Sequence, residues 1–190
     1  MPMINKSLLV HICCAPCLSG THEYWKSLDF SSIKGFFFNP NIHPFMEFKK
    51  RHHYVRLNEK FFGFNEYEYS DEYTIERTLM GMMSAGDRCE YCYRMRLDET
   101  ARRAFEDGYS HFTTTLLISP YQKQELLVDI GHDVAEKNHV MFFDEDLRRF
   151  YEMSRKIARE REIYLQGYCG CVFSEYERYG KKSNLKSTGT

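Results

Sequence analysis

Residues 7–12 read SLLVHI, and they run directly into CCAPC at residues 13–17. A short, mostly apolar run that stops at a proline-containing turn predicts a buried strand. The rest of the chain repeats this alternation, with apolar runs separated by longer segments of helical spacing. Strands that alternate with helices are typical of βαβ units. We therefore predict an α/β protein with a doubly wound, mainly parallel sheet of about five strands.

The spacing of apolar residues and turn formers gives bounds for the other elements. Further strands are expected at residues 33–38, 64–69, 111–118 and 140–143. Helices are expected at residues 18–28, 44–62, 73–85, 94–107, 122–137 and 146–166. In such a sheet, ligands bind beyond the carboxyl ends of the strands, near the point where the strand order reverses. Cys13, Cys14 and Cys17 follow the first strand, so we expect them at that edge.

The composition is that of an ordinary globular chain. Of 190 residues, 43% are hydrophobic and 28% are charged, so we predict one α/β domain over residues 8–178. The polar segment at residues 179–190 is expected to fray. A formal net charge of −1 means that a nucleic-acid partner must be held by a local patch. Without a long apolar run or an export signal, we expect a cytoplasmic protein with no membrane partner.

The seven cysteines are the most informative residues. They form the groups C-C-x-x-C, C-x-x-C and C-x-C, at Cys13, Cys14, Cys17, Cys89, Cys92, Cys169 and Cys171. An odd number of cysteines without an export signal argues against a disulfide scaffold. Inert core cysteines have no reason to cluster, whereas thiolates that share a metal do. We predict that all seven serve a metal site, with redox-active dithiols and inert core thiols as weaker alternatives.

The number of thiols also indicates what they hold. Six or seven thiols exceed the four that a structural zinc needs. The surplus suggests a four-iron cluster with a second metal, or a cluster beside free catalytic thiols. No G-x-G-x-x-G or G-x-x-x-x-G-K-[ST] motif occurs, so a standard nucleotide site is not indicated.

Three motifs together resemble one known family. They are HICCAPC at residues 11–17, RCEYCYRMRL at residues 88–97 and YCGCVFS at residues 168–174, with FNPNIHP at residues 38–44 between them. Their order is similar to that of the epoxyqueuosine reductases of the cobalamin-independent QueH type, over nearly the whole chain. The resemblance implies a sheet like that of the adenine-nucleotide α-hydrolases (the HUP fold) and an iron–sulfur cluster. It also implies the last step of queuosine synthesis, in which the epoxide of epoxyqueuosine at the wobble position of tRNA is reduced to an alkene.

That reaction consumes two electrons, which a redox cofactor must pass on from an electron donor that the sequence does not identify. We predict that a [4Fe–4S] cluster supplies them, held by Cys14, Cys89, Cys92 and Cys171. Cys13, Cys17 and Cys169 are then candidates for an adjacent mononuclear iron or zinc. The alternative for these three is late transfer of protons and electrons.

Several other residues are candidates for substrate contact. His43 is a candidate catalytic residue that donates a proton or touches the nucleoside, with a helix-capping histidine as the alternative. Glu47 is either a proton source or a solvated helix residue, and Tyr168 either stacks on a base or belongs to the core. The densest basic run is KKRHH at residues 49–53. With Arg94, Arg96, Arg102 and Arg103 it predicts a grip on tRNA phosphates, unless these charges form a solvated face.

Three other functions stay open at this point. A cluster-dependent tRNA sulfur transferase would suit a related sheet, although such enzymes normally need ATP and this chain lacks their phosphate loop. A non-enzymatic, zinc-stabilised RNA-binding module would need no redox metal. A thiol–disulfide oxidoreductase would use the Cys89–Cys92 pair, but it leaves five clustered cysteines without a purpose.

Overall fold

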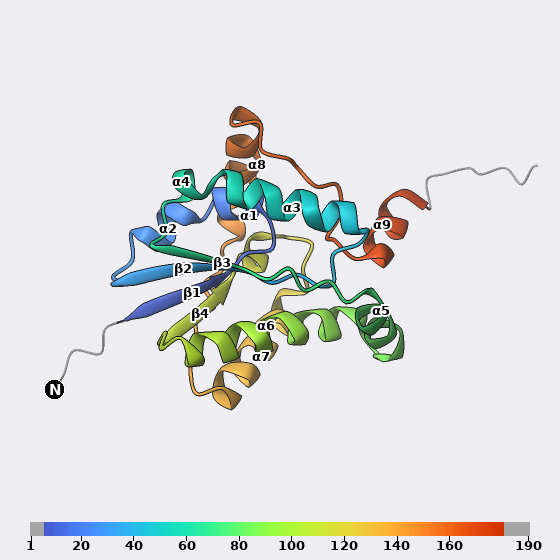
Figure 1. Cartoon of the computed structure of the whole chain (residues 1–190), viewed down its shortest axis with the longest axis horizontal. Coiled ribbons are helices and arrows are strands. Elements are labelled where there is room, and N and C mark those ends of the chain that lie inside the picture. The colour runs from blue at the N-terminus through green and yellow to red at the C-terminus, as the bar shows by residue number, and fades with distance from the viewer. Residues whose placement is uncertain (1–5, 181–190) are drawn as a thin grey trace, which may run out of the picture.

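The centre of the fold is a five-stranded parallel sheet, seen in the computed structural model that describes residues 6–180 (Figure 1). Its strand order is β3-β2-β1-β4-β5. The strands are β1 (Ser7–His11), β2 (Ser32–Phe37), β3 (Glu66–Tyr69), β4 (His111–Thr114) and β5 (Met141–Phe142). The predicted α/β class and parallel sheet are confirmed.

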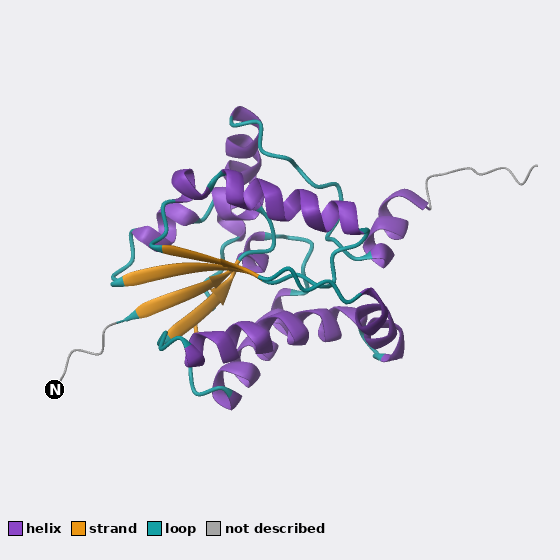
Figure 2. Ribbon diagram, viewed as in Figure 1, coloured by secondary structure: helices purple, strands orange, loops and turns teal. Residues whose placement is uncertain are grey.

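Helices cover both faces of the sheet (Figure 2). α3 (Phe45–Leu57) and α8 (Tyr151–Glu160) lie on one side, and α6 (Arg88–Glu106) and α7 (Gln124–Lys137) lie on the other. The other helices are α1 (Ala15–Ser19), α2 (His22–Lys26), α4 (Glu59–Phe62), α5 (Ile75–Ser84), α9 (Val172–Tyr179) and the 3₁₀ helices η1 (Thr115–Ile118) and η2 (Arg148–Phe150). The sheet is therefore doubly wound, as predicted. Between residues 6 and 180, no helix is long and apolar enough to cross a membrane.

β1 lies in the middle of the sheet and is buried on both faces. Leu8, Leu9 and Val10 are fully buried, and β2 and β4 pair with the strand on its two sides. A strand with two covered faces reads as a continuous apolar run rather than an alternating one. This burial is the physical reason why residues 7–12 predict a strand so clearly.

The strand order reverses beside β1. The chain passes from β1 to β2 and β3 on one side, and it then returns to form β4 and β5 on the other. The carboxyl ends of β1 and β4 therefore flank the crevice in which doubly wound sheets bind ligands. Cys13 follows β1, and its backbone N–H donates to Thr115 Oγ1 just beyond β4, at 2.9 Å. The first cysteine loop thus lies at the edge where the sequence places it.

The prediction of one helix over residues 146–166 is wrong. η2 precedes α8, and α8 ends at Glu160 because Glu162 adopts the left-handed conformation, with φ of 54°. The Ile163 N–H then donates to the Ala158 carbonyl at 2.8 Å, which is a Schellman ending. Ile163 itself turns into the core. The residues that follow form a loop, which places Tyr168 and Cys169 at the carboxyl edge of the sheet.

Local capping explains two other differences from the expected bounds. α6 begins at Arg88 rather than at residue 94, because the Asp87 carboxylate accepts a hydrogen bond from the Cys89 N–H at 2.8 Å. β4 ends at Thr114, whose Oγ1 accepts from the Leu116 N–H at 3.1 Å and starts η1. The earlier start of α6 is the important one, because it places the C-x-x-C motif in the first turns of a helix.

Two expected helices are each divided, and one helix is unexpected. Residues 18–28 form parts of α1 and α2, and residues 44–62 form α3 and α4 with a break at Asn58. α9 follows the C-x-C motif, although no element was expected there. Its first turn is capped by Cys171, whose Sγ accepts from the Ser174 N–H at 3.4 Å. The frayed tail was expected from residue 179; α9 includes Tyr179, and residues 181–190 lie outside the described part.

α8 packs directly on α1. A Cβ built on Gly20 would lie only 2.4 Å from Ser154 Cβ, so only glycine allows the two helices to approach this closely. Ser19 Oγ also donates to the Ser154 carbonyl at 3.2 Å. α8 therefore forms a wall beside the helix that carries Cys17.

Candidate metal centre

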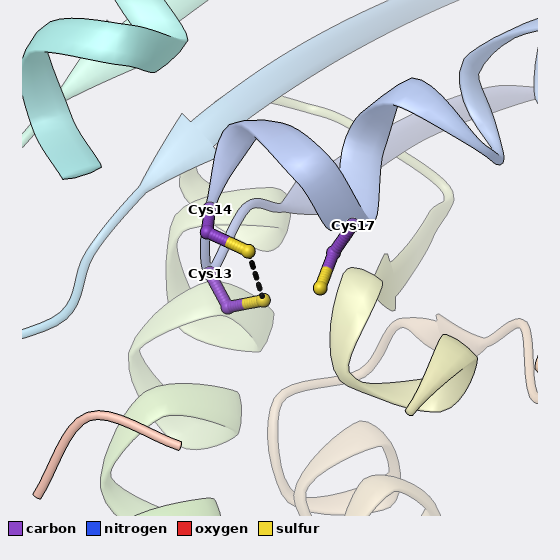
Figure 3. A group of neighbouring side chains, drawn as sticks. All are labelled: Cys13, Cys14 and Cys17. Atoms are coloured by element: carbon purple, nitrogen blue, oxygen red, sulfur yellow. Dashed lines mark hydrogen bonds between the residues drawn. The ribbon is translucent and has the colours of Figure 1, made fainter. Parts of the chain in front are cut away.

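Three thiols meet at the carboxyl end of β1 (Figure 3). The sulfur atoms of Cys13, Cys14 and Cys17 all lie within 4.8 Å of one another, and those of Cys13 and Cys14 are 3.7 Å apart. Cys14 is the extended residue before α1, and one turn of that helix returns Cys17 to the same side. All three thiols are buried. We call this group the thiol triad.

The three thiols of the triad have pKa values that are shifted in different directions. Hydrogen bonds with Cys14 and Cys17 hold the pKa of Cys13 well below its usual value, and the Thr115 hydroxyl, at 3.1 Å from Cys13 Sγ, adds to the effect. Burial raises the pKa of Cys14, and hydrogen bonding to Cys13 and Cys14 raises that of Cys17. One member therefore becomes a thiolate first, and a thiolate is the form that binds metal.

The other four cysteines come together around the start of α6, and we call them the thiol quartet. Cys89 and Cys92 lie in the first turns of that helix, and Cys169 and Cys171 lie in the loop before α9. Burial raises the pKa of Cys92 to about 12, and the charges of Cys169, Cys171 and Cys89 act in the same direction. Among the described residues, only the triad has three sulfur atoms within 4.8 Å of one another, so the quartet is more widely spaced.

The two groups do not coincide with the ligand sets expected from the sequence. Cys14, assigned to the cluster, lies with Cys13 and Cys17, whereas Cys169, assigned to the second metal, lies with the quartet. Cys169 is exposed and the other members of both groups are buried or half-buried. The identity of each ligand stays a prediction.

Arg51 fixes the C-x-C loop. Its guanidinium donates to the carbonyl oxygens of Cys169 at 2.8 Å and Tyr168 at 3.0 Å, and it pairs with Glu47 at 2.7 Å. Gly170 has φ of 138°, and a Cβ there would lie 3.2 Å from the Arg51 guanidinium, so the position requires glycine. Arg51 is only 2% exposed, which excludes it from a surface phosphate grip. Glu47 is also buried, at 8% exposed, so its description as a solvated residue is wrong.

Arg96 is a buried charge that has thiols as its partners. It is 1% exposed, and its guanidinium donates to Cys92 Sγ at 3.0 Å and to the Cys92 carbonyl at 3.2 Å. Burial acts against the charged form, but the thiols of Cys92, Cys169 and Cys13 raise the pKa of Arg96 overall. No carboxylate among residues 6–180 pairs with it. A buried cation of this kind fits an anionic group held by the surrounding sulfur atoms.

Two asparagines between the cysteine loops also have unused polar atoms. Asn39 donates to the Ile12 carbonyl at 2.8 Å, but its Oδ1 is buried without a partner among the described residues. Asn41 is fully buried, and neither atom of its amide has a partner in residues 6–180. Ile42, the next residue, would contact a Cβ at Gly170. Buried amides are nearly always hydrogen-bonded, so these atoms fit a bound group with donors or acceptors, such as the sulfides of an iron–sulfur cluster.

His43 is buried and fully engaged. Its Nδ1 lies 2.9 Å from the Tyr73 hydroxyl and its Nε2 lies 3.1 Å from Thr78 Oγ1. Its backbone N–H donates to the Gly170 carbonyl at 2.8 Å. Burial lowers the pKa of its imidazole. The structure thus places His43 as a link between α5 and the C-x-C loop, and it is not among the residues that line the cavity described below. Its catalytic role stays a prediction.

His11 is a second buried histidine, at the end of β1. Its Nε2 lies 3.0 Å from the Phe38 carbonyl oxygen and must carry the hydrogen, while Nδ1 accepts from the Thr114 hydroxyl at 2.8 Å. Burial, followed by the charge of Arg96, lowers the pKa of His11 to about 4. The imidazole is therefore neutral in the folded protein at neutral pH.

Acidification should lower the free energy of unfolding of the metal-free protein, because His11 is buried in its neutral form. Between pH 6.5 and 4, the unfolded chain takes up a proton at His11 that the folded chain does not. The contribution of neutral His11 is complete above pH 6.5, and we expect it to fall by about 3 kcal/mol as the pH drops to 4. Urea unfolding across this range should show a smaller loss for His11→Gln, whose side chain does not titrate. An equal loss in both proteins would contradict the assignment.

A cavity of about 430 Å³ opens beside the thiols. Cys13, Cys17 and Cys169 line it, so it touches both the triad and the quartet. α8 and the loop after it supply much of the wall, including Tyr151 and Tyr168. The volume lies within the usual range of pockets for small organic ligands.

Comparison with known proteins identifies the family. The profile of the family described as "Epoxyqueuosine reductase QueH" matches residues 8–177. The chain belongs to the QueH family of epoxyqueuosine reductases. The matched range contains all seven cysteines, the buried arginines and every residue of the cavity lining except Arg178.

Individual members of the QueH family support the same placement. An epoxyqueuosine reductase QueH from Dehalococcoides mccartyi is 38% identical over 177 residues, which cover 93% of this chain and 97% of the relative. The protein of that name from Thermotoga maritima is 36% identical, with 94% and 95% covered. That from Streptococcus pyogenes is 34% identical, with 90% and 71% covered.

Three residues of the site were not anticipated from the sequence in these roles. Arg96 follows Cys92 by four residues, a spacing that places both on one helix face and was a usable signal. Gln166 donates from Nε2 to Cys14 Sγ at 2.9 Å, and its Oε1 is buried without a partner in the described chain. Asn41 lies in the FNPNIHP segment, for which the sequence indicated no role of its own. The latter two come from loops, where spacing predicts no contact.

Proposed function

We propose that this protein is an oxidoreductase that reduces the epoxide of epoxyqueuosine, at the wobble position of tRNA, to the alkene of queuosine. The observation that carries the proposal is a cavity of nucleoside size, at the switch point of the sheet, that is lined by thiols from both cysteine groups. The QueH relatives bear the name of this activity. A tRNA substrate would place the reaction in the cytoplasm.

We further propose that the two thiol groups hold different metals. Three sulfur atoms bound to one tetrahedral ion at about 2.3 Å would lie about 3.8 Å apart, close to the 3.7 Å between Cys13 and Cys14. The triad therefore suits one iron or zinc ion. The quartet is more widely spaced and has four thiols, which suits a [4Fe–4S] cluster. This division exchanges Cys14 and Cys169 relative to the sets expected from the sequence.

The overall change is that the epoxide takes up two electrons and two protons and gives an alkene and water. A bound [4Fe–4S] cluster supplies electrons singly, and an external donor replenishes them. The residues of this chain prepare the site for that chemistry. Arg96 offsets negative charge in the buried centre, and Arg51 holds the C-x-C loop against α3. Leu116 and Leu165 give the cavity an apolar surface on which the carbon skeleton of a substrate can rest.

The test is turnover under anaerobic conditions. Protein reconstituted with iron and sulfide, and supplied with dithionite, should convert tRNA-borne epoxyqueuosine to queuosine. Mass spectrometry of the digested tRNA would report the loss of one oxygen atom without a requirement for ATP. Sulfur incorporation that depends on ATP would instead support a tRNA sulfur transferase. A colourless protein that holds only zinc and leaves the nucleoside unchanged would support an RNA-binding module.

A further inference from the structure

The basic residues expected to grip tRNA phosphates, at residues 49–53 and in α6, do not form one free patch. Arg51 and Arg96 are buried at the metal centre. The other three arginines, Arg94, Arg102 and Arg103, each pair with carboxylates of their own or a neighbouring element. A cation that already has a carboxylate partner gains less from a phosphate, because the first pair must be broken.

Two lysines of the patch, Lys49 and Lys50, lie over aromatic rings and outside the cavity. Two other arginines are placed differently. Arg155 on α8 and Arg178 on α9 both line the cavity that contains the thiols (Figure 1 marks both helices). Within residues 6–180, neither forms an ion pair; Arg155 lies against Tyr151, with its guanidinium carbon 5.8 Å from the ring centroid.

The one acidic residue of the cavity lining does not neutralise the charges of Arg155 and Arg178. Glu177 is the one carboxylate in the described lining, and it pairs with Arg88 at 2.6 Å. Arg155 and Arg178 therefore give the cavity lining a positive charge that its one carboxylate does not offset, and thus a positive local field. Such a field attracts anions and raises their local concentration.

An aromatic surface lies at the same mouth. Tyr121 lines the cavity and is 75% exposed, and its ring meets that of Tyr151 edge to face, with centroids 6.0 Å apart. Exposed aromatic rings beside cations are the usual means of holding single-stranded nucleic acid, because bases stack on the rings while the cations bind phosphates.

We propose that Arg155 and Arg178 bind the phosphates on the two sides of the modified nucleotide in the anticodon loop, while Tyr121 stacks on a neighbouring base. This inference rests on the proposed function, since it assumes a tRNA loop as the substrate. It moves the tRNA contact from α3 and α6 to α8 and α9. A planar guanidinium suits this role because it forms two parallel hydrogen bonds with one phosphate.

The test is RNA binding by the anaerobically reconstituted protein. The probe is a fluorescent anticodon stem–loop with guanosine at the wobble position, and anisotropy is measured over a range of salt concentrations. Arg155→Gln and Arg178→Gln should each weaken binding by about 10-fold or more. Each should also reduce the slope of log K against log salt by about 0.7, the value for one single-strand phosphate.

Arg148→Gln is the matched control, because Arg148 lies just before α8 and is already paired with Asp146 at 2.6 Å. It should bind like the unmodified protein. An RNA duplex of equal charge should be insensitive to all three substitutions, since it has no loop to open. Unchanged affinity and slope in Arg155→Gln and Arg178→Gln would overturn the proposal, as would an equal loss with the duplex.

The outcomes separate this inference from the proposed function. Loop binding that depends on Arg155 and Arg178, without epoxide reduction, would leave the inference standing and refute the reductase. Epoxide reduction by a double variant that binds the loop with unchanged affinity and salt dependence would refute the inference and leave the reductase standing.

Discussion

Cys89→Ser is expected to remove about four irons and four sulfides from the reconstituted protein, together with its visible absorbance. A serine hydroxyl is a poor ligand for iron, and Cys89 belongs to the quartet that we assign to the cluster. Epoxide reduction should fall to the rate without enzyme, because no side chain replaces the cluster as the electron source. Metal and sulfide analysis with a visible spectrum would measure the loss.

Cys17→Ser provides the matched comparison from the triad. It should keep the sulfide content and the visible spectrum, and it should lose only one metal ion per chain. Both substitutions exchange a thiol for a hydroxyl, so a general effect on folding would appear in both. Loss of all sulfide in Cys17→Ser, or retention of the full iron content in Cys89→Ser, would contradict the division of the seven thiols.

Arg96→Met should change stability in opposite directions with and without metal. In the loaded protein, Arg96 offsets a buried anionic centre, so its removal should lower the free energy of unfolding by about 3–5 kcal/mol. In the metal-free protein, burial raises the pKa of Cys92, the thiol that Arg96 contacts, and Arg96 has no carboxylate partner among residues 6–180. Methionine keeps most of the side-chain volume and should leave that form equally or more stable.

Thermal unfolding of the unmodified protein and of Arg96→Met, each before and after reconstitution with metal, would measure this change of sign. Arg102→Met is the control on the same helix, because Arg102 is exposed and pairs with Glu99 and Glu106 at the surface. It should cost less than about 1 kcal/mol in either form. An equal loss in Arg96→Met with and without metal would mean that Arg96 only packs the core.

The sheet was predictable because its strands are buried and continuous in the sequence. β1 has both faces covered, so its apolar run needs no tertiary information to be recognised. Helix bounds depended on single residues instead. The Asp87 cap moved the start of α6, and the left-handed Glu162 ended α8 early. The period of the apolar residues reveals neither event, because one is a side-chain hydrogen bond and the other is the backbone conformation of one residue.

The position of the first cysteine loop was predictable, and the grouping of the thiols was not. Clustered cysteines indicate a metal whatever the fold, but which sulfur atoms meet depends on how the loops after β1, before α6 and before α9 converge. The arginines were misjudged for a related reason. Charged residues in a sequence usually indicate a solvated surface. Arg51 and Arg96 are exceptions, because they are buried and donate hydrogen bonds to loop carbonyls and to a thiol, respectively.

The two thiol groups draw on three segments that are far apart along the chain, and this has a consequence for the order of assembly. A cofactor held by the quartet would join residues 89–92 to residues 169–171 and close a long loop, so part of its binding energy is spent on reducing the freedom of the unfolded chain. The C-x-C motif leaves the ribosome after every strand of the sheet has been made. The quartet is therefore completed only after all five strands have been synthesised, so a cofactor held by its four thiols would be inserted late in assembly.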